Sequence, residues 1–175
     1  MTSTTVEVAA LALLAAAALA AMWLGWQRRA GRWAALAAEL DGPAFATAPG
    51  EAATYLAGPM EATYVATTPV DSALERVPVR HLGVRATAEV AVGGSGLLLR
   101  RPGEADLLLP ADRLIDAAVA DGIAGTAVAR GRLVVVRWTA ADRTLQTGVL
   151  PRHDDDRVAL TDAVNRVAQT RKDAG

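Results

Sequence analysis

A long run of apolar positions opens the chain. Residues 8–26 read VAALALLAAAALAAMWLGW and contain no charged or strongly polar side chain. A helix of about 19 residues, at ~1.5 Å per residue, is as long as the ~30 Å hydrocarbon core of a bilayer is thick. The pattern therefore predicts one transmembrane helix over residues 8–26, with the lipid bilayer as its partner and residues 1–7 as a short extracytoplasmic N-terminus.

Charges and tryptophans flank this run unevenly. Glu7 is the only charged side chain before it, whereas three arginines follow it within two turns. Because positive residues stay on the cytoplasmic side, we expect a plasma (inner) membrane protein with its N-terminus outside and its C-terminal part in the cytoplasm. Indole rings favour the headgroup zone at that same end. The predicted membrane-interface residues are Trp23, Trp26, Arg28, Arg29, Arg32 and Trp33.

Two alternatives compete with a retained anchor. Ala18-Leu19-Ala20 resembles a signal-peptide cleavage site, but a secretory signal carries its positive charge before the apolar run. A buried core helix would rarely be apolar on every side over this length. Small residues also recur every four positions, as at Ala17, Ala21 and Gly25, a spacing that would let the helices of a homo-oligomer approach closely.

The segment after the apolar run changes character twice. Residues 28–40 are expected to continue as helix, and Asp41-Gly42-Pro43 to end it. Residues 42–50 have the composition of a linker, and residues 51–59 are ambiguous between linker and strand. The predicted division is therefore a juxtamembrane helix and linker over 27–59, a cytoplasmic globular domain over 60–170 and a disordered tail over 171–175.

Beyond Met60 the dominant hydrophobic period is two, which is typical of half-buried strands. It is clearest in residues 84–92, whose expected core positions are Val84, Ala86, Ala88, Val90 and Val92. Gly93-Gly94-Ser95-Gly96 predicts a hairpin turn, and Leu133–Trp138, the most β-prone run, a central strand. Residues 123–131 are expected to be irregular. The seven predicted strands are 62–67, 84–92, 97–101, 105–109, 114–120, 133–138 and 143–150.

One amphipathic helix closes the chain, from Asp154 or Asp155 to about Gln169. Its predicted core stripe is Leu160, Ala163, Val164, Val167 and Ala168. Seven consecutive antiparallel strands followed by one such helix is the order of the pleckstrin-homology (PH) superfold, which is an argument by analogy. The predicted fold class is α+β, an N-terminal transmembrane helix followed by a PH-like β-sandwich or barrel capped by a C-terminal helix.

Three stretches of the domain carry a family resemblance. They read EATYVATT at residues 61–68, ERV and HLGVR at 75–77 and 81–85, and TGVLPRHDDD at 147–156. They look like the first strand, the connection to the second strand and the approach to the C-terminal helix of a family of small actinobacterial single-pass membrane proteins with a PH-like domain. Members are loosely described as export or transporter proteins and are often encoded beside pyrimidine-biosynthesis genes. The resemblance implies a fold and a location, and it carries over no catalytic or binding residue.

Composition narrows the possible chemistry. The chain has 18 Lys+Arg against 19 Asp+Glu, a net charge of -1, and so lacks the basic field on which non-specific nucleic-acid binding depends. No nucleic-acid partner is expected. The chain has no cysteine, which excludes disulfides, thiolate metal sites and thiol catalysis.

The remaining motifs favour structural roles. Gly93–Gly96 does not fit the nucleophile motif G-x-S-x-G, because Leu97 stands at its last position. His153-Asp154-Asp155-Asp156 could hold a hard cation or form an acid–base pair, but adjacent residues at a helix start point away from one another, so helix capping is favoured. The sequence therefore predicts no catalytic residue, no cofactor and no metal site, and hence no enzyme.

Three arginines, Arg76, Arg80 and Arg85, lie in or beside the connection between the first two predicted strands. There they could contact a lipid headgroup or a protein partner, although Asp71 and Glu75 dilute their charge.

The first hypothesis for function is a membrane-anchored PH-like domain that acts as a non-catalytic protein-interaction or scaffold module on the cytoplasmic face, with an unknown protein partner. A lipid-headgroup-binding module and an accessory subunit of a membrane transport complex are the alternatives. A single helix encloses no transport pathway by itself.

Overall fold

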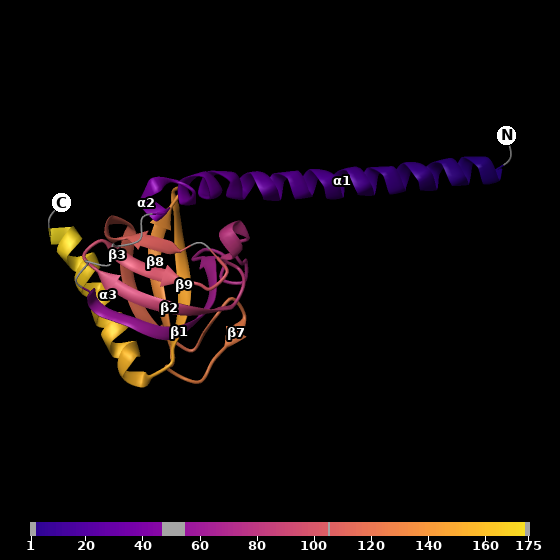
Figure 1. The fold of residues 1–175 in the computed structure, drawn as a ribbon. Coiled ribbons are helices and arrows are strands. Elements are labelled where there is room, and N and C mark those ends of the chain that lie inside the picture. The colour runs from indigo at the N-terminus through magenta and orange to yellow at the C-terminus, as the bar shows by residue number, and fades with distance from the viewer. Residues whose placement is uncertain (1–2, 47–54, 105, 174–175) are drawn as a thin grey trace. The chain divides into compact units, whose positions relative to one another are not determined.

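The computed structural model describes residues 3–46, 55–104 and 106–173 of the chain (Figure 1). Residue contacts divide the chain into two compact units, Met1–Ala35 and Leu36–Gly175. Helix α1 (Ser3–Leu40) makes up the described part of the first unit and contributes its last residues to the second.

Within α1, Glu7–Trp26 is long and apolar enough to cross a bilayer, with a mean hydropathy of 2.2. None of this stretch is buried, which is not the behaviour of a core helix. The helix continues without a break to Leu40, as the sequence predicts.

The second unit contains an antiparallel sheet and a C-terminal helix. Its elements are α2 (Pro43–Ala46), β1 (Tyr55–Pro69), the short 3-10 helix η1 (Val79–His81), β2 (Ala86–Gly93), β3 (Gly96–Arg100), β4 (Leu107–Pro110), the 3-10 helix η2 (Ala111–Arg113), β5 (Leu114–Ala120), β6 (Gly122–Ile123), β7 (Thr126–Ala127), β8 (Leu133–Ala140), β9 (Arg143–Pro151) and α3 (Asp154–Asp173). Seven strands pair in the order β4-β3-β2-β1-β9-β8-β5, and β6 and β7 form a separate hairpin. The predicted α+β fold class is confirmed.

Strand β1 makes the sheet bend. Its first part, from Tyr55 to Tyr64, pairs with β2, and its second part, from Ala62 to Pro69, pairs with β9. The register shifts between Tyr64 and Ala66, so the strand passes from one half of the sheet to the other. β1 is therefore the middle strand, and the prediction that Leu133–Trp138 forms a central strand, with a neighbour on either side, is confirmed. That run lies in β8, between β9 and β5, where neighbours on both sides account for its hydrophobicity.

Other elements differ from the expected ones at their ends. Val84 is 56% exposed and precedes β2, because its N–H bonds to His81 O in a turn rather than to a neighbouring strand. The predicted hairpin between β2 and β3 is confirmed by the pairing of Gly93 with Gly96. Gly96 has φ 135°, and a Cβ atom there would lie 2.0 Å from Leu109 O, so glycine is required at this position.

Three segments are more ordered than the sequence indicates. Residues 43–46 of the expected linker form α2, while residues 47–50 lie outside the described part of the chain. The expected irregular segment 123–131 includes the whole β6–β7 hairpin except Gly122. Helix α3 continues to Asp173, past the predicted end near Gln169.

A chain of polar side chains crosses the domain core. The Tyr64 hydroxyl donates to Leu82 O at 2.5 Å and lies 2.7 Å from Thr67 Oγ1. Thr67 Oγ1 lies 2.7 Å from Thr147 Oγ1, which accepts the Trp138 Nε1–H at 2.9 Å. Burial raises the pKa of Tyr64, so its phenol stays protonated and available as a donor. These contacts join β1, β8 and β9 and hold the connection after β1 against the sheet.

The end of α1 is an integral part of the domain. Leu36, Leu40 and Phe45 are fully buried, and the Phe45 ring lies 5.9 Å from the ring of Trp138 in β8. The Glu39 carboxylate lies 3.1 Å from the Arg113 guanidinium and accepts the Ala141 N–H in the β8–β9 turn. The compact domain therefore begins at Leu36, upstream of the expected start near Met60.

Candidate functional site

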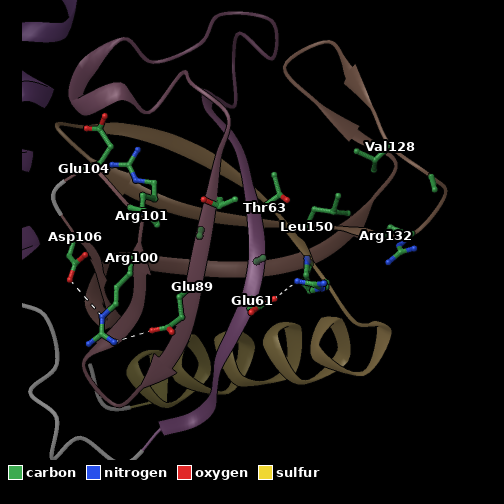
Figure 2. Close-up of a pocket in the computed structure, with 18 residues that line it drawn as sticks. Glu61, Thr63, Glu89, Arg100, Arg101, Glu104, Asp106, Val128, Arg132 and Leu150 are labelled. Carbon is green, nitrogen blue, oxygen red and sulfur yellow. Dashed lines mark hydrogen bonds and ion pairs between the residues drawn. The ribbon is translucent and has the colours of Figure 1, made fainter.

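A groove lies over one face of the sheet where β3, β2, β1 and β9 run side by side (Figure 2). Its volume is about 1090 Å³. The floor carries Thr63 of β1, with its register partners Thr87 of β2 and Leu150 of β9. Paired residues of neighbouring strands point to the same face, so these three side chains share the floor of the groove.

Two connections form the walls of the groove. The β3–β4 wall consists of residues 101–104 and 106, and the β7–β8 wall of Val128, Ala129 and Arg132. Figure 2 shows the labelled residues of the two walls on opposite sides of Thr63. The groove is thus open above a flat strand floor and bounded by two connections, a shape that accepts an extended segment.

The charges in the groove are balanced. The four basic lining residues are Arg100, Arg101, Arg132 and Arg152, and the four acidic ones are Glu61, Glu89, Glu104 and Asp106. Arg100 lies 3.0 Å from Glu89 and 3.7 Å from Asp106, and Arg152 lies 2.5 Å from Glu61. These pairs are solvent-exposed, so each stabilises the fold by at most about 1 kcal/mol. A partner with charges of its own could replace them at little cost.

Glu104 on the β3–β4 wall contacts a residue outside the groove. Its Oε2 lies 2.8 Å from Nδ1 of His81, the last residue of η1 in the connection between β1 and β2. The hydrogen bond with His81 lowers the pKa of Glu104, so this carboxylate is ionised at neutral pH. The wall therefore presents a fixed negative charge.

Arg101 is the most unusual residue of the groove because it is a charged side chain that is only 2% exposed. Its guanidinium donates to Arg80 O at 3.2 Å and to His81 O at 3.4 Å, and lies 5.1 Å from the centre of the Tyr64 ring. No carboxylate within ion-pair distance is found for it among the described residues, and its Nε has no acceptor there. Two backbone carbonyls and an aromatic face thus hold the buried charge.

The sequence analysis missed Arg101, although a signal for it exists. Leu97, Leu99 and Arg101 alternate in β3 and just after it, and all three are buried. Leu98 is buried as well, so the signal is only the place of Arg101 on the same face of the strand as Leu97 and Leu99.

The comparison with protein families agrees with this architecture. Residues 42–165 match the family model described as Bacterial PH domain-like. The chain belongs to this family. A search of curated proteins found no match. PH-like domains are in general modules that bind proteins or lipids and are typically non-catalytic, so the family supports an interaction role at this level.

The three arginines proposed for headgroup or partner contact occupy different places in the PH-like domain. Arg76 donates to Gly83 O and Thr126 Oγ1, both at 3.2 Å. Arg80 donates to Leu40 O at 2.6 Å and to Asp106 O at 3.3 Å. Arg85 is exposed. Two of the three guanidinium groups are thus bound to acceptors of this chain, and they contact different parts of the domain.

The predicted membrane-interface residues lie outside the PH-like domain, in α1. Trp23 and Trp26 are exposed, whereas Trp33 is buried. Arg28, Arg29 and Arg32 lie in the same helix. Their contact with a headgroup zone stays a prediction.

The acidic cluster lies at the start of the C-terminal helix. Asp154, Asp155 and Asp156 form the first turn of α3, next to the exposed His153. Asp154 lies 3.8 Å from both Arg132 and Arg157. Negative charge in the first turn is favourable to the helix dipole.

Proposed function

We propose that this protein is a single-pass membrane protein whose cytoplasmic PH-like domain binds an extended segment of a partner protein in the groove over β1, β2, β3 and β9. The domain acts as an adaptor or scaffold and performs no chemistry. The observation that carries the proposal is the groove itself, an open site of about 1090 Å³ on a stable strand floor, lined by charges that are balanced and exchangeable.

The covered edges of the sheet favour the groove over strand addition. At the β5 edge, the Asn165 side chain of α3 accepts the Ala117 N–H at 2.8 Å and donates to Ala117 O at 3.0 Å, which occupies the backbone groups that an added strand would need. At the β4 edge, α2 packs against the strand. The floor of the groove, in contrast, is open, with Thr87 exposed and Thr63 and Leu150 partly exposed.

The charge balance favours a protein partner over an anionic headgroup. A headgroup site needs several guanidinium or ammonium groups directed at one phosphate. Here Arg76 and Arg80 bind acceptors of the domain, and the groove lining holds as many acidic as basic residues. A mixed peptide surface matches this arrangement better.

A site-specific photo-crosslinker tests the proposal in native membranes. It is placed at Thr87 on the groove floor and, as the matched control, at Asp162 on the exposed face of α3. We expect Thr87 to capture one defined protein that Asp162 does not capture. Combined reversal of Glu61 and Arg152 to Glu61→Arg and Arg152→Glu should change the crosslinked yield if the groove binds this protein.

Other outcomes separate the alternatives. Crosslinks from Thr87 to phospholipid in place of protein would favour the headgroup-binding module. Co-purification of a multi-spanning protein that is lost with Ala17→Leu and Ala21→Leu, but not with the groove variants, would favour an accessory subunit of a transport complex. The absence of any crosslink at Thr87 would contradict the groove proposal.

The proposed topology has a direct test because the chain has no cysteine. A membrane-impermeant maleimide added to intact cells should label Thr4→Cys, in the predicted extracytoplasmic segment, and leave Asp162→Cys unlabelled until the cells are permeabilised. The opposite labelling pattern would overturn the orientation. Release of Asp162→Cys in a shortened soluble form would indicate a cleaved signal peptide.

A further inference from the structure

The turn between β1 and β2 is held in an unfavourable backbone conformation. Arg80 has φ 48° and ψ 35°, and His81 has φ 55°, so two consecutive residues other than glycine are left-handed. Such residues are strained and persist only where the surroundings hold them. Residues 80–82 are called the clamped turn below.

One side of the clamped turn is held by the β3–β4 wall of the groove. Arg101 donates to the carbonyl oxygens of Arg80 and His81, and Glu104 bonds to the His81 ring. Arg80 in turn donates to Asp106 O at 3.3 Å. Four contacts therefore join the turn to three residues that line the groove.

The other side of the clamped turn holds the end of α1. The Arg80 guanidinium donates to Leu40 O at 2.6 Å, and Leu40 is the last residue of the helix. A carbonyl at a helix C-terminus has no partner within its own helix, so this bond satisfies a group that would otherwise need water. The same arginine thus contacts both the groove wall and the helix end.

We propose that occupancy of the groove is coupled to the docking of residues 36–45 on the domain through the clamped turn. An occupant that displaces the β3–β4 wall withdraws the contacts from Arg101 and Glu104. The strained turn then relaxes, Arg80 leaves Leu40 O, and the helix end is loosened. The inference rests on the proposed function, because it makes the partner's site the point at which the helix end is regulated.

The direction of the coupling follows from the strain. An unstrained turn could move with the wall and keep Arg80 in place. A turn with two left-handed residues reaches a lower free energy when its clamp is withdrawn, so it changes conformation instead. Groove occupancy should therefore weaken the docking of the helix end.

Hydrogen exchange of the full-length protein in nanodiscs tests the coupling without any partner. A bulky maleimide on Thr87→Cys fills the groove, and the same label on Asp162→Cys is the matched control. We expect exchange of the amides of residues 37–45 to become about ten-fold faster or more with the label at position 87, and to stay unchanged with the label at position 162. Unchanged or slower exchange at residues 37–45 would overturn the coupling.

Variants of the clamp provide a second measurement in the unlabelled protein. Arg80→Gln removes the bond to Leu40 O directly, and Arg101→Met removes the contacts that hold the turn. Both should speed exchange at residues 37–45, whereas Arg130→Gln, an exposed arginine away from the clamped turn, should not. Faster exchange confined to residues 79–84 in Arg101→Met would show that the turn loosens without the helix end, and would refute the proposal.

The two proposals can fail separately. The exchange experiments need no partner, so they remain decisive if the photo-crosslinker at Thr87 captures nothing. A captured partner together with unchanged exchange at residues 37–45 would support the binding groove and reject its coupling to the helix end.

Discussion

The two ends of α1 share one helix and differ in what surrounds their leucines. Leu14, in the apolar stretch Glu7–Trp26, is 72% exposed, whereas Leu40 at the other end is 0% exposed. The first stretch is apolar on all sides, which suits a bilayer, and the last turns bury one stripe inside the PH-like domain.

This difference shows that secondary structure does not mark the domain boundary. The helix is continuous through Ala35 and Leu36, where the contacts change from one unit to the other. Leu36, Leu40 and Phe45 belong to the domain energetically, although Leu36 and Leu40 lie in the helix that contains the apolar span. A boundary placed at the end of the helix would therefore cut through the domain core.

Truncation should have the largest effect. A fragment of residues 36–175 retains the helix end and should unfold cooperatively. A fragment of residues 47–175 loses three fully buried side chains, each worth about 2–5 kcal/mol, which is comparable with the whole ~5–15 kcal/mol stability of a domain. It should therefore show no cooperative unfolding in urea. Equal stability of the two fragments would show that the helix end is dispensable.

Single leucine substitutions in the two parts of α1 should differ in their effect on the stability of the domain. Leu40→Ala creates a cavity in the domain and should lower its free energy of unfolding by about 2–5 kcal/mol. Leu14→Ala, in the exposed apolar stretch, should leave the unfolding of the domain unchanged. Urea titrations of the two full-length variants in the same nanodiscs, followed by the domain's circular dichroism, provide the comparison. A matching shift for Leu14→Ala would contradict the division.

The two glutamates of α1 should also differ in their effect on the stability of the domain, by a smaller amount. Glu39 contacts Arg113 and the Ala141 N–H, so Glu39→Ala should cost about 1.5–3 kcal/mol, the range for a hydrogen bond to a charged group. Glu7→Ala, at the start of the apolar stretch, should cost the domain nothing. Thermal unfolding of both variants measures the difference, and equal melting temperatures would show that the contacts of Glu39 do not stabilise the domain.

The smallest effect is expected from an ion pair on the sheet, away from the helix end. The hydrogen bond from Arg137 lowers the pKa of Asp116 below its ordinary value of 3.8. Because the folded pKa is the lower one, the pair contributes fully above about pH 4, and its contribution is lost as the pH falls through the folded value.

The pair is partly exposed, so this contribution is at most about 1 kcal/mol. Asp116→Asn should flatten the decline in stability below about pH 4 by up to that amount, and Asp162→Asn on α3 serves as the control. An equal decline in wild type and Asp116→Asn would show that the pair contributes nothing.

The sequence predicted most of the fold because its patterns are local. Alternation of apolar residues, a β-prone run and turn signals together located all seven strands of the sheet, and the two-residue turn after Gly93 predicted the first hairpin. The predicted core stripe of α3 is buried at all five positions. In each case one face of an element meets the core, so the period of the element appears directly in the sequence.

The groove and its contacts could not be predicted in this way. The floor joins Thr63, Thr87 and Leu150, which are distant in the chain and become neighbours only through strand pairing. The arginines also illustrate the limit. Position alone suggested that Arg76, Arg80 and Arg85 are exposed together, but the fold supplies carbonyl acceptors to Arg80 from Leu40 and Asp106.

The sequence by itself determined the apolar stretch, the strands, the closing helix and the absence of cysteine chemistry, because each depends on neighbouring residues or on composition. The tertiary structure alone decided that β1 is the middle strand, that Arg101 is buried against the clamped turn, and that the helix end lies in the domain core. These features depend on which distant segments meet. Pairing and packing across the chain leave no periodic signal in any one segment.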